Sequence, residues 1–337
     1  MLLDHLIIAL RISPLIPMAW DLGRLGVLLF FVHTSLVLML SLERSEKGGG
    51  SHLFREFYIR RAFRIYPLSV VLVLATLILH VPAEPGAQPA AVTAWAALSN
   101  LALVQDLTRA RSVIGPLWSL PIEVQMYLLL PLLYLFSRRY AMSRVVWLGA
   151  ALAALGLAGE YAVPRVPGLW RLDIFRFTPC FIAGILAYSL SRRRRVAFPS
   201  WTWPLFVASV VSFYLLWQAV FPALPDRHRP YRGWVVCWLI GAFITRFGEL
   251  TSPWLRSACH FVAKYSYGIY LGQVMALWIG FDLCARMLLG FRCLISLFAL
   301  AVISLVAYHA VESPGMSLGK RVARRFCRVP PLPSPAA

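Results

Sequence analysis

Long apolar blocks, each followed by a short charged segment, recur along almost the whole chain. Each block is roughly 17–25 residues long, which as a helix matches the ~30 Å hydrocarbon core of a bilayer. Within lipid, the backbone polar groups of a spanning segment have to be paired inside that segment, and a helix pairs them. The composition agrees, because 60% of the residues are hydrophobic and 14% are charged, against about a quarter charged in soluble domains. The sequence therefore predicts an all-α, polytopic bundle of transmembrane helices.

The apolar blocks predict about ten spans, of which the first is truncated. The segment 90–105 does not fit the series, because it is short and contains Asn100. It could be an eleventh span or a re-entrant segment. The predicted spans are 1–12 (partial), 25–42, 66–83, 116–136, 143–160, 173–190, 201–222, 233–247, 262–284 and 292–311.

The distribution of Lys and Arg decides how the segment 90–105 is placed. If it does not cross the membrane, 21 Lys and Arg lie on one side, together with the C-terminus, and 11 lie on the other. If it crosses, this asymmetry nearly disappears. Because cytoplasmic loops carry an excess of Lys and Arg, we expect a re-entrant segment near 84–114 on the outer face and a cytoplasmic C-terminus.

The chain is organised as one domain with a tail. We expect a transmembrane domain over 1–315 and a basic, then Pro-rich, cytoplasmic tail over 316–337. The net charge of +19 does not indicate a nucleic-acid partner, because the Lys and Arg lie in short loops between apolar blocks. The six Cys are scattered without CxxC or other metal-ligand spacing, and we expect no metal site.

Ionisable side chains inside membrane spans are candidate functional residues, because each costs about 2.5–3.5 kcal/mol at mid-membrane on insertion scales. His5 lies in the first apolar block. A neutral imidazole can act as a general base near pH 7. The alternative role is an interhelical hydrogen bond. Asp4 is adjacent, but neighbours on a helix point about 100° apart and need not form a pair.

Two further groups are candidates of the same kind. Arg61 and Arg64 share a helix face at i, i+3 and could hold one anionic group such as a phosphate, or they could only fix the loop in the cytoplasm. Glu123 lies in an otherwise apolar span and could belong to an active site, or it could tie helices together with Arg176 as its partner. The segment KYSYGIYLGQ (264–273) indicates close helix packing.

Taken in order, several motifs resemble those of the acyltransferase-3 family of integral membrane acyltransferases. The most specific are the R-x-x-R-I-Y-P element in REFYIRRAFRIYPL (55–68) and the W-S-L-x-x-E element in LWSLPIEVQMYLLLP (117–131). Weaker matches are GRLGVLLFFVHTSLVL (23–38), SNLALVQD (99–106), RFTPCFIAGILAY (176–188), YSYGIYL (265–271) and VESPGMSLGKR (311–321).

The resemblance implies transfer of an acyl group, commonly acetyl from acetyl-CoA, to a hydroxyl of a cell-surface or exported saccharide or glycolipid. His5 matches the family's first-span His, which is expected to be the base. Arg61 and Arg64 match the pair placed near the acyl-CoA donor, and Glu123 matches the acidic position. The resemblance also implies a multi-pass protein of the bacterial inner membrane, in contact with membrane lipids and without a bound cofactor.

The chain departs from the family pattern at three places. The family's first span has an Arg eleven positions before the His, which would precede Met1, and we expect either an internal start or an impaired enzyme. Its S-G element is Thr34–Ser35, and its usual His after S-Y-x-x-Y-L-W is Gln273, preceded by Gly272. Two other functions stay open: a transporter or flippase of a lipid-linked saccharide, and a degenerate, non-catalytic membrane scaffold.

Overall fold

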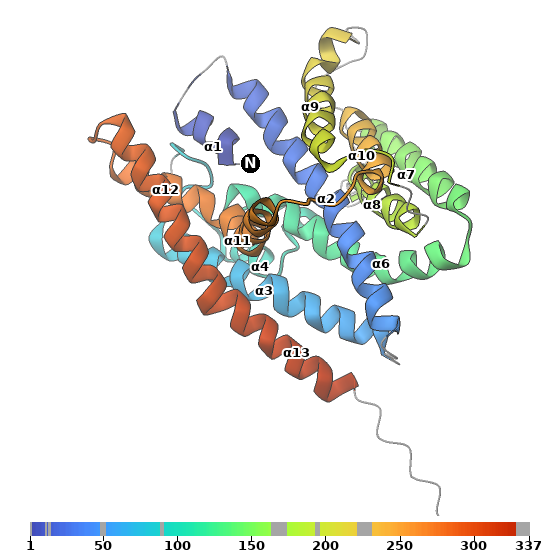
Figure 1. Cartoon of the computed structure of the whole chain (residues 1–337). Coiled ribbons are helices and arrows are strands. Elements are labelled where there is room, and N and C mark those ends of the chain that lie inside the picture. The colour runs from blue at the N-terminus through green and yellow to red at the C-terminus, as the bar shows by residue number, and fades with distance from the viewer. Residues whose placement is uncertain are drawn as a thin grey trace, which may run out of the picture.

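The computed structural model describes residues 2–10, 12, 15–47, 52–87, 91–162, 174–192, 196–220 and 231–327. Over these residues the regular structure is helical, apart from an isolated β-bridge between Phe198 and Phe247, so the all-α prediction is confirmed (Figure 1). The α-helices are α1 (Leu2–Ala9), α2 (Ile16–Lys47), α3 (Leu53–Leu79), α4 (Ala94–Leu101), α5 (Gln105–Thr108), α6 (Ser119–Arg139), α7 (Met142–Ala162), α8 (Thr178–Ser191), α9 (Trp203–Val220), α10 (Tyr231–Phe243), α11 (Pro253–Leu277), α12 (Leu289–Val306) and α13 (Ser313–Cys327).

Six helical segments of the described chain are long and apolar enough to cross a bilayer. This supports a multi-pass membrane protein, but the predicted number of about ten spans is not confirmed. Three predicted spans correspond to α1, α8 and α10, which have only 8, 14 and 13 residues. The six segments are Ile16–Lys47, Leu53–Leu79, Gly115–Arg139, Met142–Gly159, Ser200–Trp217 and Leu289–Phe326.

Helix α8, at the predicted span 173–190, is apolar but shorter than a full span. Its 14 residues extend about 21 Å at 1.5 Å per residue, which is less than the ~30 Å hydrocarbon core. Every residue from Thr178 to Tyr188 is buried, and the helix packs against α2, α7 and α10. Protein therefore covers this helix, and its apolar sequence reflects burial inside the bundle.

The segment between α3 and α6 forms two short helices, α4 and α5, of 8 and 4 residues. Neither can span a bilayer, and the re-entrant placement near 84–114 stays a prediction. Asn100 fixes the fold of this segment through both ends of its side-chain amide. Its Nδ2 donates to the carbonyl oxygens of Ala96 (2.8 Å) and Arg111 (2.9 Å), and its Oδ1 accepts from the backbone N–H of Val113 (3.0 Å).

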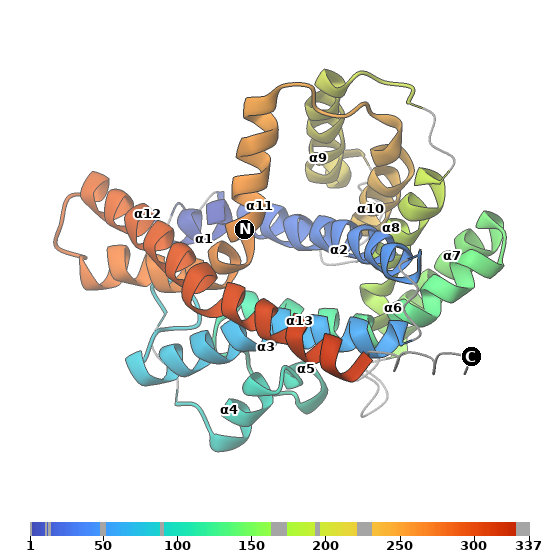
Figure 2. The ribbon, with the colours of Figure 1, turned by 60° about the horizontal axis from the view of Figure 1, so that its bottom comes forward.

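The C-terminal part of the described chain is helical from Leu289 to Cys327, with a π-helical segment, Ala307–Glu312, between α12 and α13. Helix α13 lies along α3 (Figures 1 and 2). The boundary predicted at 315/316 falls inside α13, so the basic start of the predicted tail packs on the bundle. The Pro-rich end of that tail, 328–337, lies outside the described residues.

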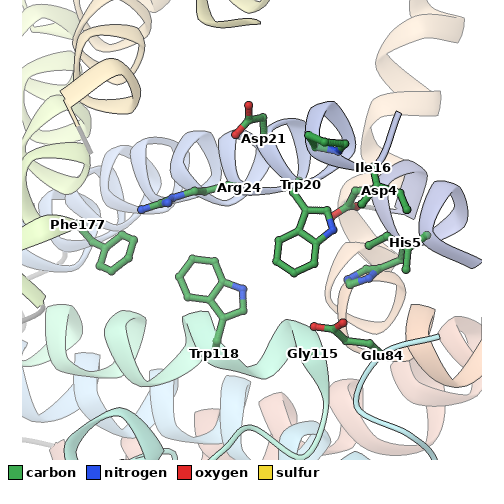
Figure 3. A pocket seen from close by; sticks show the side chains of 13 residues that line it. Asp4, His5, Ile16, Trp20, Asp21, Arg24, Glu84, Gly115, Trp118 and Phe177 are labelled. Carbon is green, nitrogen blue, oxygen red and sulfur yellow. The ribbon is translucent and has the colours of Figure 1, made fainter. Parts of the chain in front are cut away.

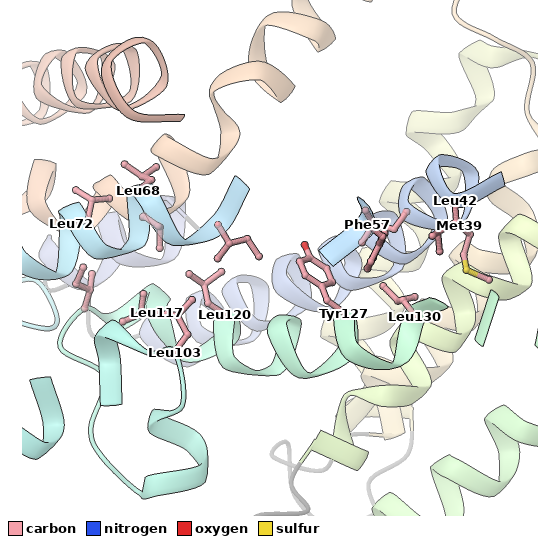
Figure 4. Close-up of a cluster of buried hydrophobic side chains, with 14 of the residues drawn as sticks. Met39, Leu42, Phe57, Leu68, Leu72, Leu103, Leu117, Leu120, Tyr127 and Leu130 are labelled. Carbon is pink, nitrogen blue, oxygen red and sulfur yellow. The ribbon is translucent and has the colours of Figure 1, made fainter. Parts of the chain in front are cut away.

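Two buried hydrophobic clusters hold the helices together. The first joins α2, α3 and α6, where Leu68 and Leu72 of α3 lie over Leu117 and Leu120 (Figure 4). The second joins α2, α8, α9 and α10 and contains Phe31 of α2, which stacks on Phe181 of α8 at a centroid distance of 4.5 Å. The long helix α2 belongs to both clusters and connects the two halves of the molecule.

Gly184 allows the close approach of α8 to α2. A Cβ at this position would overlap the Ser35 hydroxyl and the carbonyl oxygen of Val32. We expect Gly184→Ala to lower the free energy of unfolding by about 1–3 kcal/mol, because the buried backbones have to separate. Thermal unfolding of the purified protein measures this. Gly290→Ala is the matched control, because a Cβ there meets nothing within 4 Å. Equal melting temperatures for the two variants would contradict the close approach.

Candidate active site

Arg61 and Arg64 of α3 line the same cavity, as the i, i+3 spacing predicts. This cavity, the arginine cavity, has a volume of about 420 Å³ and lies between α2, α3, α6 and α11. Both arginines lie inside α3, which continues beyond them through Pro67. The described residues show no ion pair to Arg61, whose Nε is buried without a hydrogen-bond partner.

Glu123 of α6 lies in the arginine cavity with the two arginines. Its carboxylate is buried, with 4% of the residue exposed, and it accepts a hydrogen bond from the hydroxyl of Tyr127 one turn later on α6. The positive charges of Arg61 and Arg64 act on this carboxylate. The structure thus gives Glu123 these partners in place of Arg176, whose backbone carbonyl oxygen accepts a hydrogen bond from Trp234 Nε1 (2.7 Å).

Arg64 is fixed by a residue to which the sequence assigned no role. Its Nη1 lies 2.6 Å from Oε2 of Glu312, whose side chain is completely buried in the π-helical segment. The Arg64 guanidinium also lies over the ring of Tyr267, 5.7 Å from its centroid. The only sequence signal was the position of Glu312 in the closing E-x-P element. Arg64 and Glu312 are 248 residues apart, and only the packing of α13 on α3 brings them together.

The Arg64–Glu312 pair is expected to stabilise the fold. Glu312→Gln preserves the size of the side chain but leaves the partly buried Arg64 guanidinium without its counter-charge. We expect a loss of about 1–3 kcal/mol in the free energy of unfolding, measured by thermal unfolding of the purified protein. Glu56→Gln is the control, because Glu56 pairs with Arg60 at i, i+4 on a more exposed face. Glu56→Gln should lower the free energy of unfolding by less than about 0.5 kcal/mol. If both variants lose the same stability, the pair contributes no more than a surface pair.

His5 lines a different cavity, the histidine cavity, of about 500 Å³. Figure 3 shows the His5 ring and the Glu84 carboxylate on the same side of this cavity, with Trp20 and Trp118 facing each other across it. The imidazole is buried, and its Nδ1 has no hydrogen-bond partner among the described residues. A cavity of this size leaves room for a substrate beside the ring.

Two glycines allow the side chains of α1 to pack where they do. The Asp4 carboxylate lies against the backbone of Gly23 on α2, where a Cβ would overlap it. A Cβ on Gly115 would meet the carbonyl oxygen of Ala83 at 2.9 Å and Cε1 of His5 at 3.6 Å. Larger residues at these positions would displace α1 or the loop that carries Glu84, which together set the shape of the histidine cavity.

The two cavities meet at the start of α6. Trp118 faces the histidine cavity and the next residue, Ser119, faces the arginine cavity. Between them, Ser119 Oγ lies 2.7 Å from the hydroxyl of Tyr270, which donates to the carbonyl oxygen of Pro116 (2.7 Å). The structure therefore groups Arg61, Arg64 and Glu123 but places His5 in the adjoining cavity.

Helix α11 contributes more to the site than its sequence indicated. Tyr267, Tyr270 and Gln273 lie at i, i+3 and i+6 and line the arginine cavity. Close packing is confirmed for Gly268, where a Cβ would lie 3.1 Å from Cα of Ser304 on α12. The missed signal was the three-residue spacing of two hydroxyls and an amide, in which consecutive members are neighbours on the helix surface. No cluster of three His, Cys, Asp or Glu that could hold a metal ion occurs in the part of the chain that the structure describes.

The arrangement provides the groups that a group-transfer reaction requires. The arginine cavity has two cations, one of them with no ion-pair partner in the described chain, and a buried carboxylate. Guanidinium groups bind phosphate oxygens in this kind of setting. The histidine cavity has an imidazole that can take a proton.

Comparisons with known proteins find acyltransferases. Residues 2–312 match the family described as "Acyltransferase domain" (Acyl_transf_3). The acyltransferase MdmB of Streptomyces mycarofaciens is 30% identical to the chain over 152 residues, which make up 43% of this chain and 37% of MdmB. The match thus spans well under half the length of this curated relative. No solved structure matches the chain.

Proposed function

Because the chain belongs to the acyltransferase-3 family, whose members transfer acyl groups other than aminoacyl groups, we propose that it moves an acyl group, first of all acetyl, from acyl-CoA to a hydroxyl of a saccharide or glycolipid. One observation carries the assignment of the two substrates. An arginine-lined cavity adjoins a histidine-lined cavity at the start of α6.

The donor is assigned to the arginine cavity. The phosphates of acyl-CoA carry negative charge, and Arg61 can offer them charge-assisted hydrogen bonds. Arg64 is paired with Glu312 and contributes positive charge from a fixed position. The donor would enter from the cytoplasmic side, where the positive-inside rule places the basic segment before α3. Its thioester end would point along α6 towards Ser119.

The acceptor is assigned to the histidine cavity. Aromatic side chains with a few polar groups between them are typical of small-molecule sites, and Trp20, Trp118 and Phe177 line this cavity with His5 and Glu84. An acceptor hydroxyl beside the imidazole would lie next to the end of the donor cavity. The Ser119–Tyr270 pair lies between the two substrates, so the thioester has to reach past it.

His5 and the two substrates account for every bond and proton in the transfer. The acceptor oxygen attacks the thioester carbonyl carbon while His5 takes the hydroxyl proton. The tetrahedral intermediate then expels the thiolate of CoA as the C–S bond breaks, and the proton on His5 passes to the sulfur. The products are an ester and free CoA, and His5 returns to its neutral state. Glu123 keeps the charge of the arginine cavity balanced in this scheme.

Transfer from labelled acetyl-CoA tests the proposal. Membranes that contain the protein are incubated with acetyl-CoA labelled in the acetyl group and with candidate saccharide acceptors, and labelled ester is measured against membranes without the protein. A transporter or a non-catalytic scaffold would give no labelled ester. Label retained on the glycan after mild base treatment would contradict transfer to a hydroxyl, because an O-acetyl ester is cleaved by base.

A further inference from the structure

Gln273 has hydrogen-bonding groups that the described protein leaves unused. It lies on α11 with 1% of the residue exposed, and it lines the arginine cavity. Neither its Nε2 nor its Oε1 has a hydrogen-bond partner among the described residues. Buried polar groups are almost always paired, and an unpaired one costs free energy. A side chain with both a free donor and a free acceptor in a cavity is therefore suited to a ligand.

The position of Gln273 along the cavity restricts which part of a ligand it can meet. Tyr267, which lines the same cavity, has the Arg64 guanidinium over its ring, and Tyr270 lies at Ser119. Gln273 follows one turn later, about 9 Å along the helix from Tyr267 at 1.5 Å per residue. It therefore lies towards the end of the cavity that adjoins the histidine cavity, away from the arginines that would hold the phosphates.

The two tyrosines of α11 that line the cavity already have hydrogen-bond partners, in contrast to Gln273. The hydroxyl of Tyr267 donates to the carbonyl oxygen of Ile65 (2.9 Å), and that of Tyr270 donates to the carbonyl oxygen of Pro116 (2.7 Å). The orientation of α11 is fixed by packing on α12, where a Cβ on Gly272 would lie 2.6 Å from Cγ2 of Ile303. Gln273 is thus held towards the cavity and cannot turn away by a small rotation of the helix.

We propose that Gln273 recognises the pantetheine arm of the acyl donor, with Oε1 accepting from an amide N–H of the arm and Nε2 donating to an amide carbonyl. This inference rests on the proposed function, since it takes the donor to be acyl-CoA. The arm carries two secondary amides between its phosphate and its thioester, which offer both kinds of partner. A phosphate or carboxylate ligand would offer acceptors only and would leave Oε1 unpaired.

A double-mutant cycle on protein and ligand tests the contact. The full chain is purified in nanodiscs, and binding is measured by competition against labelled CoA. The protein is wild type or Gln273→Met, which preserves length and removes the amide. The ligand is acetyl-CoA or an analogue in which the amide N–H nearest the thioester is replaced by CH₂. We expect each single change to weaken binding about tenfold, and Gln273→Met to bind both ligands equally.

Two further measurements keep the test decisive. Gln105→Met is the matched control, because Gln105 is a buried amide outside the cavity that donates to the carbonyl oxygen of Leu117. It should leave the affinity for acetyl-CoA unchanged. The melting temperature of Gln273→Met without donor should equal or exceed that of the wild type, because an unpaired buried amide is removed. A lower melting temperature would show that Gln273 has a structural partner and would overturn the proposal.

The outcomes separate this inference from the proposed function. If the wild type binds no CoA, the proposed function itself fails. If the wild type binds CoA and the two changes weaken binding independently, or Gln273→Met has no effect, only the Gln273 contact is overturned. If Gln273→Met instead raises the KM for an N-acetylated saccharide acceptor without changing donor binding, the amide recognises the acceptor, which also overturns the contact with the donor.

Discussion

His5→Ala is expected to lower acyl transfer by about 10²–10⁴-fold, the contribution of a positioned general base. The imidazole lines the histidine cavity, and the described residues give its Nδ1 no partner that would indicate a structural role. The variant should still insert into the membrane and bind acyl-CoA with unchanged affinity, because α2, α3, α6 and α11 supply the lining of the arginine cavity apart from Leu2. Transfer of label from acetyl-CoA and competition binding of CoA measure the two properties separately.

Two controls distinguish a base from a packing residue. His260→Ala removes an exposed histidine of α11 that lines neither cavity, and it should keep full activity. Added imidazole should partly restore transfer by His5→Ala, because the truncated side chain leaves room for it in a cavity of about 500 Å³. Full activity of His5→Ala would show that His5 is structural and that another group takes the proton.

Arg61→Gln is expected to raise the KM for acyl-CoA by about 10- to 100-fold, since a charged hydrogen bond to phosphate contributes about 1.5–3 kcal/mol and each 1.4 kcal/mol is a factor of ten. Arg61 is the residue to change because no ion pair to it occurs among the described residues. The free energy of unfolding of Arg61→Gln should stay close to that of the wild type. The measurement is the KM for acetyl-CoA at fixed acceptor, together with thermal unfolding.

The neighbouring arginines provide the comparison for Arg61→Gln. Arg60→Gln removes the same charge from a side chain that pairs with Glu56, and the KM should stay close to that of the wild type. Arg64→Gln should lower stability as well as donor affinity, because it leaves Glu312 buried without its partner. Equal KM values for Arg60→Gln and Arg61→Gln would show that only the overall positive charge attracts the donor.

Local features of the sequence predicted the properties that depend on neighbouring residues. The length of the apolar blocks identified an all-α membrane protein, and the i, i+3 spacing of Arg61 and Arg64 placed both on one cavity. The number of spans stays a prediction, because a buried helix such as α8 is apolar whether protein or lipid surrounds it. Apolar residues indicate that a segment is removed from water, but they do not indicate whether lipid or protein surrounds it.

Contacts between distant parts of the chain were decided by the tertiary structure alone. Glu123 lies beside Arg61 and Tyr127, where Arg176 was the expected partner. Gln273 belonged to a segment interpreted as packing, yet its amide faces a cavity. The contact with Tyr127 follows the i, i+4 spacing on α6, but the approach of Arg61 to Glu123 and the position of the Gln273 amide at a cavity do not follow from spacing along one helix. Each depends on the rotation of two helices about their own axes.

The sequence by itself determined that this chain is a helical membrane protein, that it resembles the acyltransferase-3 family, and which ionisable residues lie in its apolar segments. Only the tertiary structure decided that Arg61, Arg64 and Glu123 share one cavity while His5 lines the next, and that Glu312 fixes Arg64 across 248 residues. The physical reason is the distance along the chain over which each effect acts. Hydropathy and helical periodicity act over a few turns, whereas a polar site inside a bundle is formed where helices from distant parts of the chain pack together.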